Sequence, residues 1–162
     1  RKVVHGFFTP KSMEEWRPLV KSAIAELLDA AEARGDGVDL MRDLAVPLPV
    51  LVISEMMGVP ESERPHIRML AEKLLNIGRG EPDRMRPLTE GMQGMIDYVN
   101  PMVDERIKNP KDDLISVFAS GEKSGVFTSD QVLVNTSLLL LAGHETTINL
   151  LCNGTLAFMN NR

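Results

Sequence analysis

One long helical pattern near the C-terminus constrains the fold of this sequence more than any other feature. Thr128 and Gln131 have the spacing of a capping box, in which each side chain bonds the other residue's backbone at a helix start. Apolar residues then recur with helical spacing over roughly 30 positions, as far as Met159. Helices of that length are uncommon in globular proteins. We therefore expect a central helix with the rest of the fold wrapped around it.

A polar interruption lies inside this predicted helix, where residues 138–147 read LLLLAGHETT. Glycine and threonine are weaker helix formers than leucine. A carboxylate beside an alcohol is also costly on a buried face unless both are hydrogen-bonded. The interruption therefore calls for a physical explanation.

The N-terminal half shows two further helical patterns. The first begins at the capping box Ser12–Glu15 and ends at Gly35. The second covers residues 47–57, is apolar on almost every side, and is expected to be buried. Between them, residues 38–40 could form one short strand.

Three more helices are expected before the long one. One begins near Glu61, and the next follows the apolar spacing of residues 85–102, where Pro101 is expected to kink it or break its hydrogen-bond ladder. The third is a short helix capped by Asp112 or Asp113. Loops are expected at residues 78–82 and 120–125.

Composition bounds the class of protein. The 162 residues are 43% apolar with a formal net charge of −5, which fits one globular domain over residues 1–162. The helical periodicity predicts a mainly α fold with at most one or two short strands. The acidic balance argues against nucleic-acid binding, and no apolar run reaches the length of a membrane span. A single cysteine, Cys152, excludes an internal disulfide and fits the cytoplasm. The first residue, Arg1, fits either a processed chain or a segment of a longer one.

Common catalytic motifs do not explain the polar interruption. His144 and Glu145 could begin an H-E-x-x-H zinc site, but Ile148 occupies the position of the second histidine. No G-x-S-x-G motif is present, and a cysteine in an apolar helix is usually inert. Residues 78–82 lack the spacing of a phosphate-binding loop.

Two explanations from the residues themselves stay open. Ala142 and Gly143 remove bulk, so a large flat group could approach the backbone. Thr146 follows Ala142 by four residues, so its hydroxyl can bond the Ala142 carbonyl and bend the helix, beside Glu145 as a proton relay. The alternative is a purely structural helix kink with a satisfied threonine.

The residues 142–147, AGHETT, resemble the oxygen-activation motif of the cytochrome P450 haem-thiolate monooxygenases, Ala/Gly-Gly-x-Glu/Asp-Thr-Thr/Ser. Residues 1–10 resemble the end of that family's helix C, residues 38–60 the stretch into helix E, and residues 112–118 the helix before the central one. The resemblance covers the whole chain in order and is greatest to soluble bacterial members. It implies the central helical segment of that fold.

The resemblance also implies site residues. Glu145 and Thr146 would be the acid–alcohol pair that delivers protons during dioxygen activation. Ala142 and Gly143 would be the small residues that flank the oxygen groove. Thr147 would be the threonine that ends the motif. Leu138 and Leu141 would border haem or substrate, and Arg1 would pair with a haem propionate. The substrate-lid region would contain Met85, Met92 and Met95, although their helical spacing favours plain core packing.

The implied activity is a haem b (heme, iron protoporphyrin IX) monooxygenase that hydroxylates or epoxidises a small apolar organic substrate. It would use dioxygen and a ferredoxin- or flavin-type electron donor, without nucleic acid or membrane. The family's thiolate loop, F-x-x-G-x-x-x-C-x-G, is not in this chain, because Glu145 and Ile148 stand where Cys152 would need Phe and Gly. The axial cysteine is thus expected beyond Arg162. The alternative is a non-catalytic helical binding module without haem.

Overall fold

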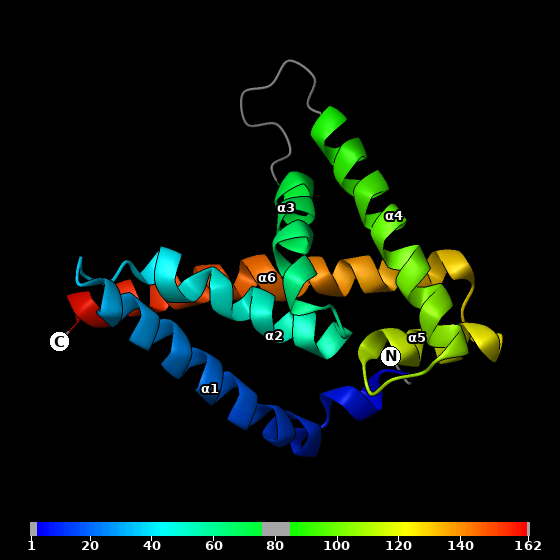
Figure 1. Cartoon of the computed structure of the whole chain (residues 1–162), viewed down its shortest axis with the longest axis horizontal. Coiled ribbons are helices and arrows are strands. Elements are labelled where there is room, and N and C mark those ends of the chain that lie inside the picture. Colours follow the sequence, from blue (N-terminus) through cyan, green and yellow to red (C-terminus); the bar gives the residue numbers. More distant parts are fainter. Residues whose placement is uncertain (1–2, 76–84, 162) are drawn as a thin grey trace. The chain divides into compact units, whose positions relative to one another are not determined.

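The computed structural model describes residues 3–75 and 85–161 of the chain (Figure 1). They form two compact units. Of the described residues, the first unit comprises 3–4, 54–75 and 85–141, and the second comprises 5–53 and 142–161. Two helices, α2 and α6, contribute residues to both units. The prediction of a single domain over residues 1–162 stays a prediction.

The described residues are almost entirely helical. The α-helices are α1 (Pro10–Arg34), α2 (Pro47–Met57), α3 (Arg64–Leu75), α4 (Arg86–Lys108), α5 (Leu114–Lys123) and α6 (Ser129–Asn160). Shorter helical turns are η1 (His5–Phe8), the π-helical η2 (Met41–Ala45) and η3 (Glu61–Glu63). The mainly α fold class is confirmed, and no strand occurs within the described ranges. No helix among them is both long and apolar enough to cross a membrane.

The first helix of the second unit begins earlier than predicted. Thr9 is the N-cap of α1, because its side chain accepts the backbone N–H of Ser12 at 3.1 Å and Pro10 occupies the first turn. The capping box expected at Ser12–Glu15 was therefore wrong. The helix ends as predicted at Gly35, whose φ of 71° is the left-handed conformation that glycine adopts without strain.

The short strand expected at residues 38–40 does not form. Asp43, in η2, accepts the backbone N–H of Asp39 at 2.8 Å and is held by Arg34 at 2.7 Å and Arg42 at 2.8 Å. Asp39 in turn accepts the N–H of Met41. These side chains take up the backbone donors that a strand would need, and they begin a helical turn instead.

The core of the first unit lies between α3, α4 and α5. The side chain that Gly94 lacks would lie 2.5 Å from Leu70 Cδ2, so glycine allows the close approach of α4 to α3. The buried face of α4 comprises Gly91, Met95, Val99, Val103 and Arg106. Met85 and Met92 lie outside this face and are exposed, so of the three candidate lid methionines only Met95 packs in the core.

Several element boundaries follow local signals. The cap of α5 is Asp113, whose carboxylate accepts the N–H of Ser116 at 2.7 Å. The turn expected at residues 120–125 starts later, because α5 continues to Lys123. Pro101 lies inside α4 and does not end it. The loop predicted at residues 78–82 lies outside the described residues.

Candidate functional site

The candidate site lies on α6, the long helix predicted from the sequence. Its capping box is confirmed: Gln131 N–H donates to the Thr128 hydroxyl at 3.2 Å, and Thr128 N–H donates to the Gln131 side chain at 3.1 Å. The helix extends for 32 residues without a break at the polar interruption. The AGHETT residues therefore have helical geometry throughout.

The two faces of α6 differ in exposure. One face is buried at every fourth residue, comprising Val132, Thr136, Leu140, His144 and Ile148. Ala142, Glu145, Thr146 and Asn149 are exposed. The residues expected to carry chemistry thus project from the open face of the helix. His144, to which the sequence assigned no role, lies on the buried face with 4% exposure. Its spacing from Leu140 and Ile148 could have shown this.

Thr146 makes the hydrogen bond that its spacing predicted. Its hydroxyl donates to the carbonyl oxygen of Ala142 at 2.8 Å. The hydroxyl of Thr147 donates in the same way to the Gly143 carbonyl at 3.3 Å. Two consecutive carbonyls therefore accept a side-chain hydroxyl in addition to their place in the helix ladder. Each hydroxyl oxygen keeps lone pairs with which it can accept a further donor.

Gly143 has a packing role that the sequence reading missed. A Cβ atom at this position would lie 3.1 Å from Ile53 Cγ1 and 3.2 Å from Ile53 Cδ1. Both residues belong to the second unit, so the absent side chain admits α2 close to α6. Space for a planar ligand was predicted at both Ala142 and Gly143, but the structure leaves space only at Ala142. Ala142 is exposed, whereas the Cβ direction of Gly143 is filled.

Glu145 is exposed and loosely held. One of its carboxylate oxygens lies 3.4 Å from Nδ2 of Asn149, a long hydrogen bond within α6. No ion pair involving Glu145 occurs in the part of the chain that the structure describes. A carboxylate held this weakly can swing between solvent and the helix surface.

The other predicted residues are placed as follows. Leu138 and Leu141 precede the motif on α6, where Leu138 is 56% exposed and Leu141 is half-buried. Arg1 lies outside the described residues. Cys152 is a half-buried free thiol in α6. Over residues 3–75 and 85–161, no cluster of three or more His, Cys, Asp or Glu side chains could hold a metal ion.

An open helical face with a methyl-sized side chain suits a planar apolar cofactor such as haem. Ala142 leaves its backbone accessible, and the hydroxyls of Thr146 and Thr147 are folded back onto carbonyls and so do not project. The residues present on α6 therefore fit one side of such a group, and the cofactor would need an iron ligand from elsewhere.

Known proteins resemble the chain over nearly its whole length. It is 34% identical over 160 residues, 98% of the chain, to cytochrome P450 CYP107DY1 of Priestia megaterium, of which it covers 38%. It is 37% identical over 163 residues, 99% of the chain, to the cytochrome P450 monooxygenase PikC of Streptomyces venezuelae, of which it also covers 38%.

The solved structure of cytochrome P450 PksS from Bacillus subtilis 168 matches the fold. The TM-score is 0.86 at 32% identity, and the match covers 99% of this chain and 40% of that chain. No protein-family model matches the chain. The chain spans about two fifths of the length of the curated relatives it matches. These likenesses in sequence and fold identify it as a central segment of the cytochrome P450 family.

Proposed function

We propose that the complete protein is a haem-dependent monooxygenase, which activates dioxygen to hydroxylate or epoxidise a small apolar organic substrate. The single observation that carries this proposal is the hydrogen bond from the Thr146 hydroxyl to the Ala142 carbonyl on the exposed face of α6, beside Glu145. The names of the relatives, which are cytochromes P450, support the same reaction class.

Each residue has a role in this proposal. Haem, when bound, supplies the centre at which dioxygen is reduced. The small side chain of Ala142 would leave room for dioxygen beside a bound haem. Thr146 donates its hydroxyl proton to the Ala142 carbonyl, so its oxygen keeps lone pairs that would accept a hydrogen bond from a water molecule at the oxygen groove. Glu145 exchanges protons with solvent and passes them to that position.

The remaining assignments belong to the same proposal. The cofactor is haem b, and Leu138 and Leu141 border the haem or the substrate. Thr147 lies beside the groove, and Arg1 pairs with a propionate. A ferredoxin- or flavin-type donor supplies two electrons, so that one oxygen atom enters the substrate and the other leaves as water. The single cysteine supports a cytoplasmic location.

A carbon monoxide difference spectrum of the complete protein tests this proposal. Thiolate-ligated haem gives the strongly red-shifted absorption band that defines the family's spectrum, and we expect that band. The competing hypothesis, a helical binding module without haem, predicts no haem absorbance after expression with a haem precursor. That result would overturn the enzyme assignment. If the band appears but no apolar test substrate is converted to product, the protein binds haem and the monooxygenase proposal is wrong.

A further inference from the structure

A concave site lies in the first unit, away from the AGHETT residues in sequence. It is an open groove of about 400 Å³ between η3 and the C-terminal half of α4, with Lys111 at one edge. That volume lies within the range of small-molecule sites. Its lining combines apolar side chains with charges of both signs, which is unusual for a simple packing defect.

One end of the groove presents an acidic acceptor. The Tyr98 hydroxyl donates to a carboxylate oxygen of Glu63 at 2.6 Å, and this bond joins α4 to η3. Burial raises the pKa of Tyr98 above its ordinary value, and the bond to Glu63 adds to the rise, so the hydroxyl stays a donor. The centroid of the His66 ring lies 5.8 Å from that of the Tyr98 ring, with the two ring planes tilted by 50°. The Glu63 carboxylate has further lone pairs that can accept a second donor.

The other end presents cationic donors. Arg106 is 5% exposed and donates Nε to Asp113 at 2.6 Å and Nη2 to the Gly58 carbonyl at 3.2 Å. Its Nη1 donors have no acceptor among the described residues. Lys111 also lines the groove, and no carboxylate within the described ranges pairs with its ammonium group. The nearby Glu105 carboxylate is engaged by the Asn109 side-chain amide at 3.2 Å.

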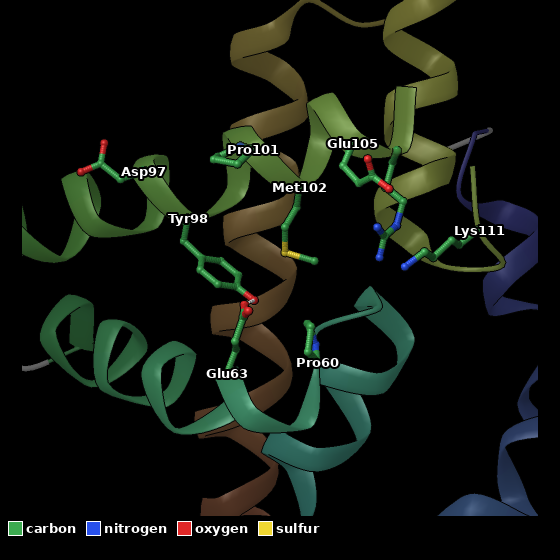
Figure 2. A pocket seen from close by; sticks show the side chains of 9 residues that line it. Pro60, Glu63, Asp97, Tyr98, Pro101, Met102, Glu105 and Lys111 are labelled. Carbon is green, nitrogen blue, oxygen red and sulfur yellow. Dashed lines mark hydrogen bonds between the residues drawn. The ribbon is translucent and has the colours of Figure 1, made fainter. Parts of the chain in front are cut away.

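An apolar floor separates the two ends. Figure 2 shows the Met102 side chain extending into the space above Pro60, with the Tyr98–Glu63 pair on one side and Lys111 reaching in from the other. Asp97 belongs to the lining but points away in the same view. The groove therefore has an acceptor end, an apolar middle and a donor end.

We propose that this groove binds an organic zwitterion whose ammonium and carboxylate groups are separated by an apolar spacer. The ammonium group contacts Glu63, the spacer lies on Met102, and the carboxylate contacts Lys111 and the free donors of Arg106. Charge-assisted hydrogen bonds of this kind are stronger than neutral ones, so both ends contribute. This site is independent of the monooxygenase proposal.

Four probes of matched length test the proposal on the complete protein: 6-aminohexanoate, hexanoate, hexylamine and hexanol. The readout is the NMR signal of a ¹³C-methyl label at Met102, assigned by its loss in Met102→Leu. We expect 6-aminohexanoate to shift this signal with a dissociation constant on the order of millimolar, as suits so small a ligand. The dissociation constants of hexanoate and hexylamine should each be about tenfold higher, and that of hexanol should be higher still. Equal or better binding by hexylamine, hexanoate or hexanol would overturn the proposal, as would no shift with any probe.

Two variants assign the ends. Glu63→Gln keeps an acceptor for Tyr98 but removes the charge. It should therefore weaken the binding of 6-aminohexanoate about tenfold and leave the binding of hexanoate unchanged. Lys111→Met should also weaken the binding of 6-aminohexanoate, but it should leave the binding of hexylamine unchanged. Asp97→Asn is the matched control and should change neither. Circular dichroism checks that each variant folds. If Glu63→Gln fails to fold, Lys111→Met still tests the proposal, because Lys111 is exposed. Uniform effects of both variants on all charged probes would contradict the assignment.

Discussion

Arg106 and Asp113 form an ion pair that is almost wholly removed from solvent. Their Nε and Oδ2 atoms lie 2.6 Å apart, and the two side chains are 5% and 4% exposed. Arg106 also reaches the Gly58 carbonyl, and Asp113 caps α5. The pair therefore joins α4, the start of α5 and the residue after α2, all within the first unit.

Breaking this pair should destabilise the protein strongly. Asp113→Asn leaves Arg106 charged without its partner, and the loss of a buried partner costs about 3–5 kcal/mol. Urea unfolding of the complete protein, followed by circular dichroism, measures this. The control is Asp112→Asn, the exposed neighbour, which should stay within about 0.5 kcal/mol of the parent protein. Equal effects of the two variants would show that the ion pair contributes little.

Gly143 and Ile53 should show coupled stability effects. Gly143→Ala gains up to about 1 kcal/mol of helix propensity but places a methyl group against Ile53 Cγ1 and Cδ1. Ile53→Val removes Cδ1 and relieves part of that contact. We expect Gly143→Ala to be more favourable in the Ile53→Val background by about 0.5–1.5 kcal/mol, measured as a double-mutant cycle in urea. Strict additivity would mean that the two helices do not meet here in solution.

Replacement of Thr146 should separate haem binding from productive chemistry. In the complete protein, Thr146→Ala should keep the haem spectrum but divert reductant to peroxide, because the hydroxyl beside the oxygen groove is lost. The product formed per reductant consumed should fall several-fold, while Thr146→Ser should retain most of it. Peroxide yield and product are measured in the same assay. An unchanged ratio in Thr146→Ala would reject the proposed role of the hydroxyl.

Asp43 should make stability depend on pH in the acid range. Hydrogen bonds from Arg42, and then from Arg34 and the Asp39 backbone, hold the pKa of Asp43 well below its ordinary value of 3.8. A depressed folded-state pKa stabilises the protein above the unfolded-state value, and this stabilisation is lost as the pH falls through the folded-state value. The stability difference between the parent protein and Asp43→Asn should thus be constant from pH 7 to about pH 5 and shrink below about pH 4.

Urea titrations at each pH measure this difference. The control is Asp36→Asn, whose carboxylate is exposed and contacts Arg34 at 3.3 Å. It should change stability little at any pH because exposed ion pairs contribute little. A difference for Asp43→Asn that grows on acidification would contradict the assignment.

Local features of the structure were predictable from the sequence because their partners are close along the chain. The capping box at Thr128 and Gln131, the stop at Gly35, and the bond from Thr146 to Ala142 each join residues within four positions or depend on one residue. The place of the polar interruption within α6 was also readable from the helical periodicity. These features are enough to locate the candidate site.

Other local predictions failed because two signals competed. Thr9 and Ser12 are both acceptable N-caps, and Pro10 shifts the choice to Thr9 because it favours the first turn of a helix. At residues 38–40, apolar residues suggested a strand, but Arg34 and Arg42 hold Asp43 so that it captures the Asp39 backbone. The outcome depends on Arg34, which is contributed by α1.

By itself, the sequence determined the helices, the position of the polar interruption on α6, and the family resemblance. Only the tertiary structure showed that Gly143 accommodates Ile53, that Arg106 meets Asp113 beside Gly58, and that Tyr98 reaches Glu63. Periodicity determines which face of a helix a residue occupies, but not which residue of another element packs against that face. That partner depends on how segments distant in the chain pack together. The same packing determines which side chains are buried and which charges pair.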